Sequence, residues 1–197
     1  TYINLNKLLN QFDNLFKKSS NQIVLKHIEG LIIGSTLVSI SMNEILEIDQ
    51  NKKLLFSKKI NAENQKIIIR IFRTFKFIDE NDKMTEKGIF FYERSSAYGV
   101  TVSYMPLFSN IETLLFNDTS NILKRDQSGN ELHVNRKMNI WGSGGAHKLY
   151  FKKIDEIVLE IFNRPIDLQP QGLADMGCGD GTLLIHLYDI IVKKTLR

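Results

Sequence analysis

The chain has 197 residues, a length typical of one domain, or of one small domain with part of another. Apolar residues make up 43% and charged residues 24% of the sequence, which excludes a chain that is disordered throughout. A single cysteine, Cys178, excludes a disulfide scaffold and any cysteine-based zinc cluster. The formal net charge of +4 is too small to indicate nucleic-acid binding by itself.

The sequence has no pattern typical of targeting or of a membrane span. Residues 1–5 lack a basic region followed by a long apolar run. The apolar run 31–34 is far shorter than the roughly 18 uninterrupted apolar residues that a spanning helix needs. We therefore expect a cytoplasmic protein that does not bind a membrane. Because the first residue is Thr1 rather than Met, we expect a processed product or an excised piece.

Apolar residues at helical spacing predict three helices near the N-terminus. The first covers residues 5–16, and the second carries a stripe over residues 24–32. Gly34 is expected to interrupt this second helix before a third one, at about residues 35–48.

A fourth helix and a hairpin-like segment follow. Asn61 is a predicted N-cap for a helix with one apolar face. Residues 77–78 are predicted as extended, residues 80–83 as a turn, and Thr85 as the cap of the next helix. Helices followed by such an excursion are typical of a winged-helix arrangement. The apolar face of the fourth helix consists of Ile68, Ile71, Phe72 and Phe75.

The middle of the chain is predicted to contain a turn, a helix and a linker. The turn is at residues 98–99, and the helix begins near Pro106, a residue tolerated in a first turn. Over residues 117–137 the apolar periodicity stops and Asp, Ser, Gly and Asn indicate a loop or linker. The glycine-rich stretch 142–145 is predicted as a second flexible place.

The C-terminal part is predicted as helix, strand, glycine loop and helix. An amphipathic helix over residues 150–161 is stopped at residues 163–165. Residues 173–176 form a short apolar run typical of a strand, and residues 183–191 give the last helix. The loop between this strand and this helix contains Gly177, Cys178, Gly179, Asp180 and Gly181.

The glycine loop is the sharpest functional signal, because it lies between a predicted strand and a predicted helix. Gly177 can adopt backbone angles that let the chain turn sharply off the strand. Gly179 and Gly181 have no Cβ, so that a ligand can approach the backbone closely. The helix starting at about Thr182 points its positive end at the loop, which favours a carboxylate or phosphate there.

The spacing is G-x-G-x-G with Asp175 two positions before the first glycine, unlike the dinucleotide pattern G-x-G-x-x-G. In this the chain resembles the class I S-adenosylmethionine-dependent methyltransferases, whose first motif D-x-G-C-G-x-G is matched at every fixed position. The resemblance implies S-adenosyl-L-methionine as cofactor, with the loop around its methionine part and Asp175 at its amino group. The cofactor-binding residues implied are Asp175, Gly177, Cys178, Gly179, Asp180 and Gly181.

The resemblance extends upstream. Residues 134–147 with Tyr150 and Phe151 look like the segment before this motif in methyltransferase domains of polyketide assembly lines, including the apratoxin-type C-methyltransferases. In those proteins a helical, winged-helix-like lid precedes the core. The resemblance implies a mainly α fold that ends in the first βα unit of a Rossmann-like methyltransferase core. The parts expected are a lid over 1–117, a linker over 118–145 and the start of the core over 146–197.

A class I core needs about seven strands, whereas this chain stops one helix after the first strand. The resemblance puts the residue that holds the ribose, and most catalytic residues, beyond Arg197. The catalytic residues are therefore unknown, and we expect a fragment that is inactive alone. A single βα unit cannot form a sheet, so the last segment is expected to pack on the helices or on a partner.

The function implied is transfer of the sulfonium methyl to a carbon or oxygen nucleophile, with catalysis mainly by positioning. The polyketide resemblance implies an acyl group on a carrier protein as substrate. It also implies an acyl carrier protein or other assembly-line modules as partners, and a homodimer through the lid. No metal site is expected, because His27, His133 and His186 have no partner at metal-ligand spacing.

Two other classes of function compete with this one. A DNA-binding regulator would use the helix with Arg70 and Arg73 for recognition, but most of that helix's circumference is apolar. We therefore expect no specific nucleic-acid binding. A helical docking domain with a vestigial Rossmann remnant is the third class, and the intact glycine motif argues against it.

Three single residues near the motif have a functional and a structural interpretation. His147 is a cofactor or metal contact, or, as we prefer, an exposed residue of a first helical turn. Trp141 covers an adenine ring or is buried against the lid. Cys178 is a nucleophile activated by the helix N-terminus or, as we prefer, a small loop residue.

Overall fold

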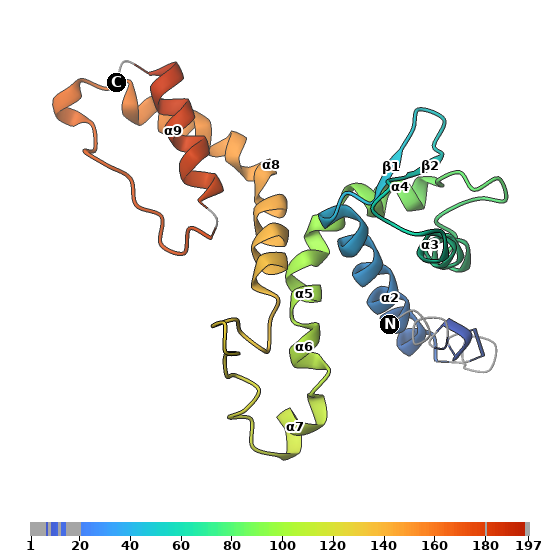
Figure 1. Cartoon of the computed structure of the whole chain (residues 1–197). Helices are drawn as coiled ribbons and strands as arrows, with labels where there is room; N and C mark the ends of the chain where they lie inside the picture. The colour runs from blue at the N-terminus through green and yellow to red at the C-terminus, as the bar shows by residue number, and fades with distance from the viewer. Residues whose placement is uncertain (1–6, 8, 12, 15–20, 180, 196–197) are drawn as a thin grey trace.

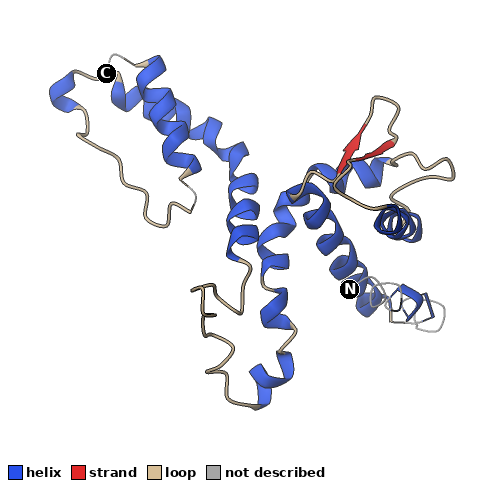
Figure 2. Cartoon of the chain, in the orientation of Figure 1, coloured by secondary structure: helices blue, strands red, loops and turns tan. Residues whose placement is uncertain are grey.

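The computed structural model describes residues 7, 9–11, 13–14, 21–179 and 181–195, without the side chains of residues 146–149 and 152. The chain is mainly helical, and its one named sheet has two strands (Figures 1 and 2). The α-helices are α2 (Gln22–Met42), α3 (Ala62–Thr74), α4 (Glu86–Glu93), α5 (Gly99–Ser103), α6 (Met105–Phe108), α7 (Ile111–Phe116), α8 (Arg136–Phe162) and α9 (Thr182–Lys194). The strands are β1 (Leu46–Ile48) and β2 (Leu54–Phe56), and the 3-10 helices are η1 (Ser95–Tyr98) and η2 (Ile166–Leu168).

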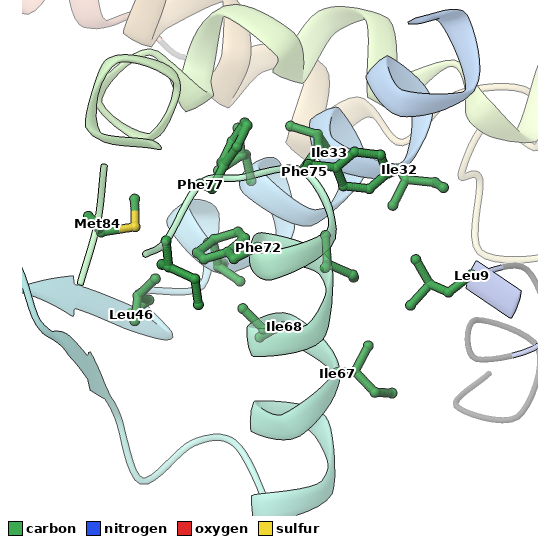
Figure 3. Packing of buried hydrophobic residues seen from close by; sticks show 14 of the residues in the cluster. Leu9, Ile32, Ile33, Leu46, Ile67, Ile68, Phe72, Phe75, Phe77 and Met84 are labelled. Atoms are coloured by element: carbon green, nitrogen blue, oxygen red, sulfur yellow. The ribbon is translucent and has the colours of Figure 1, made fainter. Parts of the chain in front are cut away.

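Helices α2, α3 and α4 and the β1–β2 hairpin enclose the main hydrophobic core (Figure 3). Phe72 and Phe77 are fully buried at its centre, with ring centroids 5.8 Å apart. The strands pair antiparallel with Leu46 opposite Phe56, and Lys53 bridges to Lys83 of the following loop. This arrangement confirms the mainly helical, winged-helix class.

The two helix caps predicted from the sequence are present. The Oδ1 of Asn61 accepts the backbone N–H of Asn64 at 2.9 Å, and the Oγ1 of Thr85 accepts that of Gly88 at 3.1 Å. Each cap satisfies a backbone donor that the first turn of a helix leaves unpaired. The predicted apolar face of α3 is likewise buried.

The predicted break at Gly34 is wrong, because α2 continues through it for 21 residues. Gly34 is buried against Tyr98 and Val102, and packing of this kind stabilises a helix more than a local glycine weakens it. The end of the predicted third helix is strand β1 instead. The first predicted helix, residues 5–16, lies largely outside the described residues.

Helix α2 also has the length and composition of a membrane span. Its buried residues include Leu37 and Ile40, which belong to the winged-helix core. A core helix passes the same test of length and composition.

Three loops that connect extended segments share one hydrogen-bond pattern. They start at Asp49, Asp79 and Asp126, and in each the Asp Oδ1 accepts the backbone N–H groups two and four residues later, at 2.8 to 2.9 Å. The residue three positions after the Asp has a positive φ: 63° at Lys52, 57° at Asp82 and 83° in the third loop. An aspartate that caps its own turn in this way fixes a tight reversal without a glycine-rich sequence.

Residues 98–99 are not the predicted turn, because η1 continues directly into α5 there. The helix predicted from Pro106 onward is divided into α6 and α7. Ser109 Oγ and Asn110 Nδ2 each donate to the carbonyl of Pro106 at 2.8 Å, and such side-chain bonds compete with helix continuation.

The glycine-rich stretch 142–145 is not the predicted flexible place, because it lies inside α8. A Cβ on Gly142 would lie 2.7 Å from the Cα of Gly99, so these glycines let α8 and α5 cross in direct backbone contact. A Cβ on Gly145 would likewise lie 2.5 Å from the Cβ of Ser96. Residues 117–135 are irregular, as expected for a linker, whereas the proposed domain limits at 117 and 145 stay a prediction.

Helix α8 runs from the winged-helix domain to the C-terminal hairpin, where α9 packs against it (Figure 1). Val158, Phe162 and Leu187 form the buried centre of this contact. The last segment thus packs on a helix, as expected. Residues 173–176, the predicted strand, are irregular, and the described part of the chain offers them no neighbouring strand with which to pair.

Candidate functional site

All three motif glycines have left-handed backbone angles. The φ angles are +87° at Gly177, +59° at Gly179 and +77° at Gly181. Residues with a Cβ rarely adopt such angles, so the loop conformation itself requires glycine at these positions. The conformation thus explains the motif spacing without reference to any ligand.

The glycines also leave the loop accessible. A Cβ on Gly177 or Gly181 would meet nothing within 4 Å, and one on Gly179 would meet only Ile140 of α8, at 3.9 Å. The space beside the loop is therefore open to a ligand. Asp180 lies outside the described residues.

The N-cap position of α9 is a glycine, which supplies no side-chain cap. Gly181 is the N-cap residue, and its backbone N–H donates to the carbonyl of Cys178 at 2.9 Å to close the turn. The first turn of α9 carries no acidic residue. The positive end of the helix therefore faces the loop, where an anionic or polar ligand group would be stabilised.

A cleft of about 490 Å³ separates the loop from α8. On the loop side, four of the predicted site residues line it, together with Thr182 and Leu183 of α9. These four are Asp175, Gly177, Cys178 and Gly179. Asp175 is half-buried, and the thiol-bearing Cys178 is exposed.

The opposite wall of the cleft comes from α8, and the sequence did not reveal it. Its residues are spaced three and four apart, which puts them on one helical face. If the sequence from residue 136 onward had been interpreted as one continuous helix, instead of a linker up to residue 145, this face would have been recognisable. The wall consists of Arg136, Asn139, Ile140, Ser143, Gly144 and Phe151.

Among the described residues of that wall, Arg136 alone carries a charge. Its Nε and Nη2 donate to the two carboxylate oxygens of Glu131 at 2.7 and 2.8 Å. The hydrogen bond from Arg136 holds the pKa of Glu131 below its usual range, and the pKa of Arg136 is raised by the same bond. The guanidinium plane is therefore fixed on one side by a bidentate pair.

Hydrogen bonds connect this wall to Ser103 of α5. Asn139 Nδ2 donates to the Oγ of Ser103 at 2.9 Å, and the backbone N–H of Asn135 donates to the Ser103 carbonyl at 2.8 Å. Ser103 ends α5 and is fully buried. The start of α8 is thus attached to α5, and Asn139 both takes part in this attachment and lines the cleft.

A second polar contact joins α8 to α9 below the cleft. His186 Nε2 and Asp155 Oδ1 are 2.5 Å apart, and the His186 ring packs on Phe151 with centroids 5.4 Å apart. Because Phe151 lines the cleft, this pair lies directly behind it. Among the described residues, no group of three His, Cys, Asp or Glu side chains could hold a metal ion.

Two of the single residues considered above can be located. Trp141 packs against the lid, since its Cε3 would lie 3.1 Å from a Cβ on Gly99, and it is not part of the cleft lining. This favours burial over an adenine contact. The side chain of His147 lies outside the described residues.

Two families of known proteins match the chain. Residues 29–118 match the family described as the AprA winged helix domain. Residues 131–197 match the family described as the AprA MT2-like domain. No curated protein matches the chain.

Proposed function

We propose an S-adenosylmethionine-dependent methyltransferase, because residues 29–118 match the AprA winged helix domain and residues 131–197 match the AprA MT2-like domain. The chain would supply the winged-helix domain and the glycine loop of this enzyme, and the acceptor is an acyl group on a carrier protein. S-adenosylmethionine supplies the methyl group from its sulfonium. The observation that carries the proposal is the open cleft beside Gly177 and Gly179, which Asp175 also lines.

The residues of the cleft fit the methionine part of this cofactor. The Asp175 carboxylate can accept hydrogen bonds from an ammonium group. The loop backbone and the positive end of α9 suit polar groups, whereas Ile140 and Phe151 supply apolar walls. The role of these residues is to hold the cofactor in one orientation, which is the main source of rate in a transfer between two bound groups.

We test the loop by placing valine at Gly179 in the full-length protein. Valine is β-branched and disfavours a φ of +59°, and its methyl groups would enter the open cleft. We expect binding of S-adenosylhomocysteine, measured by calorimetry, and methyl transfer to be lost while the helical circular dichroism is retained.

Gly172→Val is the matched control. A Cβ on Gly172 would meet nothing within 4 Å, and Gly172 does not line this cleft. Cofactor binding should be unchanged in this control. Wild-type affinity in Gly179→Val would remove the loop from the cofactor site.

The proposed carrier-protein partner is supported by a basic cleft of about 530 Å³ beside the first. Arg125, Arg136 and Lys137 line it, with Glu131 as the one acidic residue among those described. Positive charge of this kind attracts an acidic protein surface or a phosphate group. Lys137→Glu should raise the KM for a carrier-bound acyl substrate but not for a free thioester, and equal KM changes for both would contradict this partner.

We also propose that the winged-helix domain does not read DNA sequence, and that the protein is cytoplasmic. Arg73 donates to both carboxylate oxygens of Asp82 at 2.9 and 2.7 Å, and Arg70 donates to Asn10 and Asp13. Side chains held in this way do not extend from α3 into a groove. A gel shift at physiological salt should show no preference between selected and random duplexes, and nanomolar binding relaxed by Arg70→Ala would contradict the proposal.

A further inference from the structure

The charges of the first cleft are arranged for a ligand that carries both signs. Among the described residues that line it, Arg136 is the one cation and Asp175 the one carboxylate. They come from opposite walls, Arg136 from the start of α8 and Asp175 from the segment before the glycine loop. An α-amino acid group, with its ammonium and its carboxylate, has the complementary pair of charges.

The guanidinium of Arg136 can bind a second carboxylate. Arginine has five N–H donors, of which Glu131 occupies two, on Nε and Nη2, and the Tyr104 side chain forms a further hydrogen bond with the guanidinium. The edge of the guanidinium formed by Nη1 and Nη2 remains suitable for a bidentate bond to another carboxylate. Glu131 fixes the plane in which this edge lies, so that little side-chain freedom is lost when a ligand binds.

The pairing with Glu131 does not cancel the attraction for a ligand carboxylate. Arg125 and Lys137 line the neighbouring cleft together with Arg136, so that three cations surround one acid there. Arg125 contributes to the lowered pKa of Glu131, after the hydrogen bond from Arg136. The local balance therefore stays positive at neutral pH.

We propose that Arg136 binds the carboxylate of the methionine part of the cofactor, opposite Asp175 at its ammonium group. This inference rests on the proposed function and assigns a binding role to a residue outside the glycine motif. It also makes the lid part of the cofactor site, because Asn135 and Asn139 on either side of Arg136 are bonded to Ser103 of α5.

The test removes the carboxylate from the ligand and the guanidinium from the protein in turn. Calorimetry on the full-length protein compares S-adenosylhomocysteine with its decarboxylated analogue. Charge-assisted hydrogen bonds of this type lead us to expect about 10- to 100-fold tighter binding of the ligand that keeps its carboxylate. In Arg136→Gln the two ligands should bind within about threefold of each other.

Arg125→Gln is the matched control. Arg125 is another arginine of the same region, donates to the carbonyl of Gly129 at 2.8 Å, and lines only the neighbouring cleft. It should keep the ratio of the two affinities close to that of wild type, because Arg125 adds positive charge near Arg136 but does not line the first cleft. Arg136→Lys keeps the charge without the guanidinium edge, and should give an intermediate ratio even if Arg136→Gln does not fold.

The outcomes separate this inference from the proposed function. If the wild-type protein binds S-adenosylhomocysteine and Arg136→Gln and Arg136→Lys keep its ratio, Arg136 does not hold the carboxylate and the proposed function stands. If the wild-type protein binds neither ligand, both are overturned. A ratio that falls in both Arg136 variants and stays in Arg125→Gln supports the inference.

Discussion

The winged-helix domain and the α8–α9 hairpin differ in how far they bury their apolar side chains. In the winged-helix domain Phe72 is fully buried and Met84 is 2% exposed, within a continuous core. In the hairpin Ile185 is 64% exposed and Tyr188 66%, and the buried centre is small. The first region encloses its own core, whereas the second exposes large apolar faces.

One of these exposed faces forms an apolar groove of about 370 Å³. It lies between α9, the end of α8 and the segment around Leu173, and includes Tyr188 and Val192. In α/β folds the helices cover a parallel sheet, and the faces toward that sheet are apolar. The winged-helix fold therefore encloses its core with its own side chains, whereas the described part of the hairpin leaves an apolar groove open.

The largest difference in stability loss between the two regions is expected when one phenylalanine in each is replaced by alanine. Phe72→Ala leaves a cavity in a closed core and should lower the free energy of unfolding by about 3–5 kcal/mol. Phe162→Ala should cost less, because Phe162, although buried, belongs to a small centre with Val158 and Leu187 that borders the open groove, so that neighbouring side chains and water can fill the space. Urea denaturation followed by circular dichroism measures both, and equal losses would show that the two regions do not differ in this way.

A smaller effect is expected where the two regions meet. Gly142→Ala puts a Cβ 2.7 Å from the Gly99 Cα and the Val100 backbone nitrogen, so that α5 and α8 must separate. Overpacking of this kind costs typically about 1–3 kcal/mol. Trp141, the one tryptophan of the chain, packs at this contact and should report the separation by its fluorescence.

Gly30→Ala is the control for a helical glycine without neighbours. Gly30 is exposed on α2, and a Cβ there would meet nothing within 4 Å. The alanine should therefore stabilise the protein by roughly 0.5–1 kcal/mol. If Gly142→Ala were also stabilising, the close contact between α5 and α8 would be absent in solution.

Removing one helix cap in each region tests the same contrast between the winged-helix domain and the hairpin. The loss of a cap typically lowers the free energy of unfolding by about 1 kcal/mol. Thr85 caps α4 and also donates from Oγ1 to the carbonyl of Lys76 at 3.0 Å, so Thr85→Ala removes a cap and a link to the core. Asn135 caps α8 through the N–H of Met138 at 3.0 Å. Thr85→Ala should lower the midpoint of global unfolding, whereas Asn135→Ala should mainly increase hydrogen exchange in the first turn of α8.

Features set by neighbouring residues in the sequence could be predicted. Asn61 and Thr85 are recognisable as caps, because a cap needs only a side-chain acceptor three residues before a backbone donor. The glycine motif is recognisable for a similar reason, since a left-handed φ at Gly177 and Gly179 is a local requirement.

Features set by distant contacts could not be predicted. Gly34 and Gly142 suggested breaks, but each packs against a helix that is far away in the sequence. Arg136 seemed to belong to a linker, so its place in the cleft was missed. The β1–β2 hairpin was missed because its reversal depends on Asp49, and the sequence around it contains neither glycine nor proline.

The smallest effect is expected from the aspartates that cap the loops. The backbone N–H of Lys83 lowers the pKa of Asp79 below its ordinary value of 3.8. A carboxyl group with a lowered pKa in the folded state stabilises that state above its unfolded pKa, and this contribution is lost as the pH falls through the folded value. Asparagine keeps the acceptor oxygen without the charge, so Asp79→Asn should lower Tm slightly at pH 7, and the difference from wild type should shrink below about pH 3.8.

Asp126→Asn provides the comparison between regions. A side-chain hydrogen bond from Asn130 lowers the pKa of Asp126, but its loop lies outside the winged-helix core. Loss of this charge should leave the Tm of the winged-helix core, and its dependence on pH, unchanged, because the loop is not part of the cooperative unit that melts. Thermal melts of both variants between pH 3 and 7 would contradict the independence of this loop from the winged-helix core if Asp126→Asn changed the transition as much as Asp79→Asn.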